Sequence, residues 1–137
     1  MKMKKYFLVC TCFLISTVTL ADDAISKVCA GGAGTVIMGN NGTEYCMSNN
    51  GMTWWTALGW CQAIGKTPFR YPEDCRCIGS GCPETMTKCP NLAEVGKGLY
   101  VWTSMPSGDT NAWLVALSDG HANADNRLVN NKKALCF

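Results

Sequence analysis

Apolar residues recur at helical spacing in the segment MTWWTALGWCQAIG, residues 52–65. Thr53 has a side-chain oxygen that can cap the start of a helix, and Gly65 can end one in the left-handed conformation. The spacing predicts a helix of about three turns. Trp55 and Trp60 lie outside the stripe. We expect both to pack beneath the long loop; the alternative is that they are exposed and stack on sugar rings. The inward stripe consists of Trp54, Ala57, Leu58, Cys61 and Ile64.

On either side of this helix, the apolar pattern is that of β-strands. The segment GTVIMGNNGTEYCMS, residues 34–48, has two β-favouring runs around Asn41 and Gly42, which predicts a hairpin because both residues tolerate positive φ. Later runs, LYVWTS, NAWLVALSDG and KALCF, predict antiparallel strands with one buried face. We expect Trp102 and Trp113 on that face.

Residues 66–98 have a different composition. Prolines, glycines and four closely spaced cysteines exclude long regular elements and predict a long loop held by local cross-links. Within it, NLAEVG, residues 91–96, is compatible with a single helical turn ending at glycine. Ser118, Asp119 and Gly120 predict a later turn between strands.

The first 21 residues resemble a secretory signal peptide. Three lysines precede an apolar run that is too short to span a bilayer, and small residues surround Ala21. Cleavage there would remove 21 of the 137 residues and leave 116, the size of one domain, over residues 22–137. Three of the 12 basic residues would leave with the leader, so nine would remain against 10 acidic residues. This balance argues against nucleic-acid binding, and no second apolar run predicts a membrane span. We therefore expect a secreted, periplasmic or cell-surface protein.

Eight of the 10 cysteines lie after the leader, an even number that favours four disulfides in an exported chain. Cys29 and Cys46 flank the first strand of the hairpin, so a bridge between them would hold the amino-terminal segment to the second strand. The alternative for the loop cysteines is a four-thiolate zinc site. We favour disulfides because the leader implies an oxidising compartment, and we expect neither a metal nor a cofactor.

The order of these elements resembles the C-type lectin-like domain superfamily. The residues that carry the resemblance are WWTALGWCQAIG, YVWTS, NAWLVALSDG and the closing ALCF. It implies an α+β fold of short antiparallel sheets, one main helix and a long disulfide-linked loop. It also implies a disulfide between Cys61 and Cys136. Four cysteines in the long loop allow three pairings, of which we favour Cys75–Cys89 with Cys77–Cys82.

The chain departs from the sugar-binding members of that superfamily. It lacks their calcium-binding triplets, Glu-Pro-Asn or Gln-Pro-Asp in the long loop and Trp-Asn-Asp before the last strand. The loop offers chiefly Glu73, Asp74 and Glu84, whereas calcium takes six to eight oxygen ligands. We therefore expect any ligand binding to be independent of calcium.

Two polar segments near the carboxyl end are the candidate ligand-binding regions, because they connect the last predicted strands. They are SMPSGDTN, residues 104–111, and DGHANADNRLVNN, residues 119–131. The alternative interpretation is ordinary turn chemistry. The candidate ligand-binding residues are Ser107, Asp109, Asn111, His121, Asn123 and Arg127.

No local motif predicts catalysis, since neither a nucleophile–base pair nor a C-x-x-C redox pair is present in its usual context. The resulting hypothesis is a non-enzymatic recognition module that binds a glycan or a protein at the cell surface. One alternative is a structural or adhesive subunit of a fimbrial or adhesin type. Another is an exported enzyme or thiol-redox protein.

Overall fold

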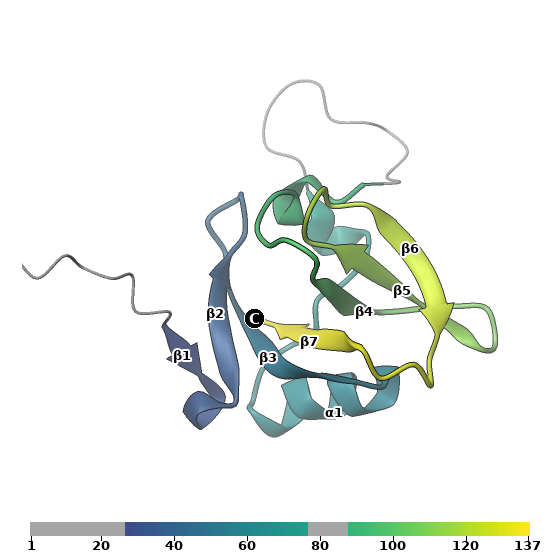
Figure 1. Ribbon diagram of the computed structural model, residues 1–137, viewed down its shortest axis with the longest axis horizontal. Helices are drawn as coiled ribbons and strands as arrows, with labels where there is room; N and C mark the ends of the chain where they lie inside the picture. The colour runs from purple at the N-terminus through teal and green to yellow at the C-terminus, as the bar shows by residue number, and fades with distance from the viewer. Residues whose placement is uncertain (1–26, 77–87) are drawn as a thin grey trace, which may run out of the picture.

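The computed structural model describes residues 27–76 and 88–137, which form an α+β fold of one α-helix against one seven-stranded sheet (Figure 1). Short 3₁₀ turns connect some of these elements. In chain order, the elements are β1 (Val28–Cys29), η1 (Ala30–Gly32), β2 (Gly34–Met38), β3 (Glu44–Met52), α1 (Trp54–Ala63), η2 (Glu73–Cys75), η3 (Pro90–Leu92), β4 (Tyr100–Ser107), β5 (Asn111–Ala116), β6 (Ala122–Asn126) and β7 (Lys132–Cys136).

The sheet is mixed, and its order is β1-β2-β3-β7-β4-β5-β6. The last strand, β7, lies between β3 and β4, antiparallel to the first and parallel to the second. The expectation of short antiparallel sheets is correct for the pairing within β2–β3 and within β4–β5–β6, but these strands belong to one mixed sheet. The reason is that β7 joins the β2–β3 hairpin to the β4–β5–β6 meander, so both belong to one sheet.

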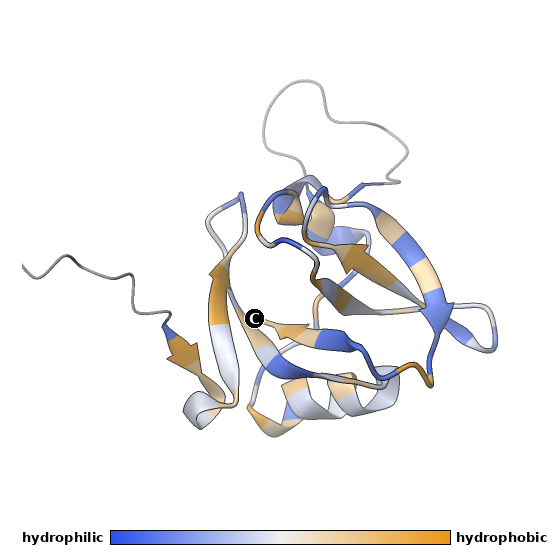
Figure 2. Ribbon diagram, in the orientation of Figure 1, coloured by the Kyte–Doolittle hydropathy of each residue, from blue (hydrophilic) through white to orange (hydrophobic). Residues whose placement is uncertain are grey.

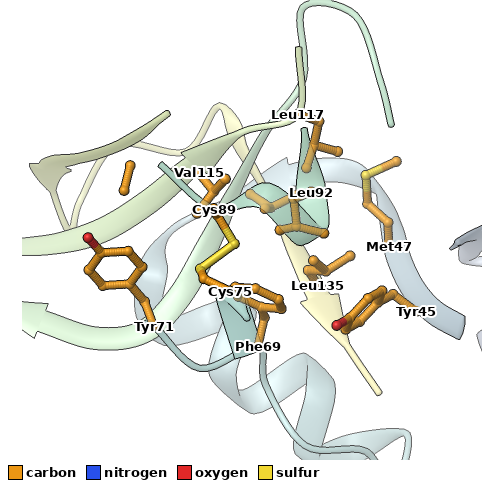
Figure 3. Close-up of a cluster of buried hydrophobic side chains, with 12 residues drawn as sticks. Tyr45, Met47, Phe69, Tyr71, Cys75, Cys89, Leu92, Val115, Leu117 and Leu135 are labelled. Atoms are coloured by element: carbon orange, nitrogen blue, oxygen red, sulfur yellow. A yellow bond between two sulfur atoms is a disulfide. The ribbon is translucent and has the colours of Figure 1, made fainter. Parts of the chain in front are cut away.

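Both faces of the sheet are buried at its centre, which corrects the expectation of a single buried face. Neighbouring residues of a strand point to opposite faces, so Val101 joins one apolar cluster and Trp102 the other. The first cluster lies under the long loop and includes Phe69, Leu92 and Leu135 (Figure 3). The second cluster lies under α1. Trp102 is buried as expected, whereas Trp113 is only partly buried.

Helix α1 follows the predicted pattern. The Thr53 side chain accepts a hydrogen bond from the Thr56 amide, and Gly65 has a φ of 70° just beyond the carboxyl end. Trp54, Ala57 and Cys61 are buried, and Leu58 and Ile64 pack partly buried at the margin of the same cluster. The Trp54 indole N–H donates to the Thr103 carbonyl over 2.7 Å, which ties the helix to β4.

The β2–β3 hairpin is confirmed, but its turn is longer than an Asn-Gly dipeptide. Residues 39–43 connect the strands, and Gly42 has positive φ while Asn41 does not. The Asn41 side chain instead accepts a hydrogen bond from the Thr43 amide. The expected turn at residues 118–120 is present, with Gly120 at a φ of 75°. The predicted helical turn at residues 91–96 is the shorter η3, shifted toward Pro90.

Strand β6 lies within a segment that we expected to be a polar connection. Its sequence, Ala-Asn-Ala-Asp-Asn, alternates only alanine with polar residues and has no large apolar side chain; β6 is an edge strand, and much of its length is exposed. Figure 2 shows the apolar β5 beside the hydrophilic bands of β6. Two backbone amides of β6, those of Ala124 and Asn126, donate to the side chains of Asn123 and Asp125.

Three of the four expected disulfides are present: Cys29–Cys46, Cys61–Cys136 and Cys75–Cys89. The fourth expected pair, Cys77–Cys82, lies outside the described residues. Cys75 and Cys89 cross-link the long loop inside the first apolar cluster, where the bond is visible in Figure 3. Several disulfides in so short a chain indicate an oxidising, extracytoplasmic environment.

One buried lysine links the two ends of the β6–β7 connection. Lys132 is 8% exposed, and its ammonium lies 3.1 Å from the Asp125 carboxylate. That ammonium lowers the pKa of Asp125, and the backbone amide of Asn126 lowers it further. The ion pair therefore stabilises the fold while the carboxylate is charged.

Replacing Asp125 with asparagine is expected to lower the free energy of unfolding by up to about 1 kcal/mol at neutral pH, because the pair is partly exposed. A carboxyl group whose folded pKa is lowered stabilises the fold fully above its unfolded pKa of about 3.9. That contribution is lost as the pH falls through the folded value. Denaturant titrations between pH 7 and pH 2 should show the two proteins converge in acid; a constant difference would contradict this origin.

Candidate ligand-binding site

The structure gathers four of the six sequence-predicted site residues at one end of the β4–β5–β6 meander. These four surround the β4–β5 turn and the end of β6: Ser107, Asp109, Asn111 and Arg127. Ser107 and Asn111 are directly paired across the hairpin. The polar turn and the start of the β6–β7 connection therefore form one surface.

The other two predicted residues lie elsewhere. His121 is exposed after the β5–β6 turn. Its backbone forms an isolated antiparallel β-bridge with Lys88, and its amide donates to the Asp119 carboxylate. Asn123 lies on the outer strand β6, opposite Leu114. Successive turns of an antiparallel meander fall at opposite ends of the sheet, so the β4–β5 and β5–β6 turns cannot share one site.

Arg127 holds the gathered surface together. Its guanidinium donates to the carbonyls of Asn111 and Gly108 over 2.9 and 2.7 Å, which fixes the β4–β5 turn. The same group lies over the Trp54 ring at 4.7 Å and the Trp55 ring at 5.7 Å. The backbone of Arg127 also accepts from the Trp54 amide. One side chain thus connects the hairpin to the start of α1.

Trp55 forms the apolar wall of a hollow at this junction. Its side chain is 60% exposed, although its ring meets the buried Trp54 ring edge-on at a centroid distance of 4.5 Å. The hollow has a volume of about 370 Å³. We call it the Trp55–Arg127 groove, and it is lined by Trp55, Asp109, Thr110, Asn126, Arg127 and Leu128.

The polar groups of this groove are held by local hydrogen bonds. The Thr110 hydroxyl lies 3.3 Å from the Asn111 side-chain oxygen, to which it donates. The Asn126 side chain accepts from the Leu128 amide, which turns Leu128 outward to 77% exposure. An amide oxygen is not a base that could take the Thr110 proton, so this hydrogen bond does not activate the hydroxyl as a nucleophile.

The expectation that Trp55 and Trp60 pack beneath the long loop is wrong. Helix α1 packs on the apolar cluster at one face of the sheet, whereas Phe69, Cys75 and Leu92 of the long loop belong to the cluster at the other face. Trp60 borders the cluster under α1, and Trp55 faces solvent. The sequence signal for Trp55 was its position beside, rather than within, the inward stripe.

A second polar hollow, about 290 Å³ in volume, lies beside the β2–β3 turn and is less suited to a ligand. Arg70 and Asp74 line it and bind each other through two side-chain hydrogen bonds. The Asp74 carboxylate raises the pKa of Arg70, as expected for a pair whose charges satisfy each other. Burial raises the pKa of Tyr45 in the same hollow, so its phenol stays neutral at physiological pH.

Within the part of the chain that the structure describes, no group of three or more His, Cys, Asp or Glu side chains could hold a metal ion. Glu73 and Asp74, the two described residues among those considered for calcium, do not belong to such a group. Over residues 27–76 and 88–137, no helix is long and apolar enough to cross a membrane.

Comparisons with known proteins add no relative to this picture. The chain matches no protein-family model, no curated protein and no solved structure. What the Trp55–Arg127 groove could bind is therefore inferred from the chemistry of its lining residues. An exposed indole beside hydroxyl, amide and carboxylate groups can stack on the apolar face of a sugar ring and hydrogen-bond its hydroxyls.

Proposed function

We propose that this protein is an extracytoplasmic recognition module of C-type lectin-like fold that binds a glycan in the Trp55–Arg127 groove without calcium. The observation that carries the proposal is the exposure of Trp55, a large ring that remains 60% accessible in a chain whose Trp54 and Trp102 are buried. An exposed ring held firmly from behind can bind with little loss of side-chain entropy.

The polar rim of the groove supports a hydroxylated ligand. Asp109 and Asn126 are exposed, and both offer oxygen acceptors to sugar hydroxyls. The Arg127 guanidinium is held by two backbone carbonyls and stacked on two indoles, so it acts mainly as a rigid wall. The groove therefore combines one stacking surface with several fixed hydrogen-bonding groups.

The lectin-like assignment is supported by the Cys61–Cys136 disulfide, the bond that the resemblance implied between the main helix and the last strand. Calcium independence is supported by the lack of the calcium-binding triplets in the sequence. The disulfides favour action outside the cytoplasm, where a surface glycan is accessible.

Replacing Trp55 with alanine is expected to weaken glycan binding by at least about tenfold while leaving the fold intact, because a central tryptophan dominates binding sites and this one is largely exposed. The measurement is a glycan array with the oxidised protein, with and without chelator, followed by titration of each bound glycan.

Tyr100→Ala is the matched control, since Tyr100 is a 46% exposed aromatic that does not line the groove. Glycan binding that is unaffected by Trp55→Ala would overturn the choice of site. Loss of binding in chelator would overturn calcium independence. An array without any bound glycan, combined with capture of a protein ligand that depends on Trp55, would overturn the glycan proposal.

A further inference from the structure

Trp55 also lines a second hollow, whose other lining residues differ from those of the groove. This hollow has a volume of about 510 Å³ and runs beside the outer surface of α1 toward the segment that follows the helix. We call it the helix-side hollow, and it is lined by Trp55, Leu58, Gly59, Gln62, Lys66, Thr67 and Pro68. One exposed indole is thus shared by two hollows.

The helical residues of the second hollow continue in line from Trp55. Leu58, Gly59 and Gln62 follow Trp55 by three, four and seven positions, which places them along one side of the helix. Seven residues of α-helix rise by about 10 Å. A ligand that stacks on Trp55 and extends along the helix therefore passes Gly59 before it reaches Gln62.

Gly59 is unusual because the fold does not require a glycine there. A methyl group at this position would meet no atom within 4 Å, and glycine lowers helix stability relative to alanine. The missing side chain leaves the floor of the helix-side hollow open. A ligand that approaches the helix backbone closely would explain a glycine at this position, whereas helix formation does not.

The charges of the two hollows favour a ligand without strong net charge. Lys66 is the charged residue of the helix-side hollow, and Asp109 and Arg127 are those of the groove. The Arg127 guanidinium already donates to two carbonyls. Hydroxyl, amide and indole groups make up most of the remaining polar lining, which suits a neutral sugar chain better than a polyanion.

We infer that the Trp55–Arg127 groove and the helix-side hollow form one extended site for a chain of equatorially linked hexopyranoses, with Trp55 at its centre. The inference rests on the proposed function, and it adds the ligand class: an oligosaccharide chain rather than a single terminal sugar. Equatorial linkages keep the chain extended and present the apolar faces of its rings to the indole.

The test uses the oxidised protein and two series of probes, β-1,4-linked oligomers of glucose and of N-acetylglucosamine from two to six units, measured by calorimetry. We expect at least one series to gain tenfold or more in affinity between two and six units. Gly59→Leu should raise the melting temperature, because glycine lowers helix stability. The leucine side chain also fills the helix-side hollow, so the variant should lose the gain in affinity with length while its affinity for the shortest bound oligomer stays unchanged. Gln62→Ala should reduce the gain in part.

Ala63→Leu is the matched control, because Ala63 lies on the same helix and lines neither hollow. A gain with length that Gly59→Leu leaves intact would overturn the inference. Equal affinity at all lengths would also overturn it, although binding that depends on Trp55 would keep the proposed function. If neither series binds while other glycans on the array do, the ligand class is wrong. An array without any bound glycan is the separate failure of the proposed function.

Discussion

Replacing Cys61 and Cys136 together with alanine is expected to lower the free energy of unfolding by about 4 kcal/mol. The bond closes a separation of 75 residues, so its removal gives the unfolded chain a large gain in entropy. Both cysteines are almost fully buried, and alanine leaves no unpaired thiol that could form wrong disulfides. Denaturant titration of the two oxidised proteins measures the difference.

The matched control is the double alanine variant of Cys29 and Cys46, which closes only 17 residues. The same loop-entropy argument gives about 3 kcal/mol for that bond. Equal or greater loss for the Cys29 and Cys46 variant would show that the long bridge does not act through the unfolded chain. Loss of the helix signal alone in the Cys61 and Cys136 variant would instead indicate a local role at α1.

Trp102→Ala is expected to cost about 3–5 kcal/mol, comparable to loss of the long disulfide. Trp102 is 2% exposed in the cluster between the sheet and α1, and its indole N–H donates to the Met52 carbonyl over 2.8 Å. Alanine would leave a cavity in that cluster and an unpaired carbonyl at the start of the helix. Thermal and denaturant unfolding both measure this loss.

Trp102→Phe separates the two contributions, because it keeps most of the apolar volume and removes the indole N–H. We expect it to lose about 1–2 kcal/mol. Trp55→Ala, which removes the same kind of side chain from an exposed position, should change stability by less than about 1 kcal/mol. Similar losses at Trp55 and Trp102 would contradict the assignment of one to binding and the other to the core.

The sequence predicted those features that depend on neighbouring residues. Helix α1 depends on its capping Thr53, its apolar stripe and Gly65, all within 13 positions, and each has the expected role. The hairpin also follows from local pattern, although its turn is longer. The inward side of α1 and the disulfide to Cys136 are consistent with each other, since Cys61 belongs to the predicted stripe.

Features that depend on pairing between distant strands cannot be predicted from local sequence pattern. The insertion of β7 between β3 and β4 buries both faces of the central strands, and alternation within a single strand cannot reveal a partner on each side. The edge strand β6 alternates only alanine with polar residues, which is too weak a pattern to predict a strand.

The same limit applied to the candidate site. Arg127 and Asp109 were found as polar residues of two connections, but Trp55 joins them only because Arg127 reaches across to the start of α1. More than 50 residues separate Trp55 from Asp109 in the chain. Local pattern alone favours packing for Trp55, because large aromatic side chains are mostly buried in small domains.

The side chains that hold the backbone amides of β6 have a consequence for how this protein can assemble. A sheet edge recruits a strand from another molecule by offering free amides, and Ala124 and Asn126 have theirs engaged by Asn123 and Asp125. The opposite edge, β1, is only two residues long. Fibre growth by strand addition at β6 would therefore have to displace these internal hydrogen bonds, and β1 offers little length for such an addition.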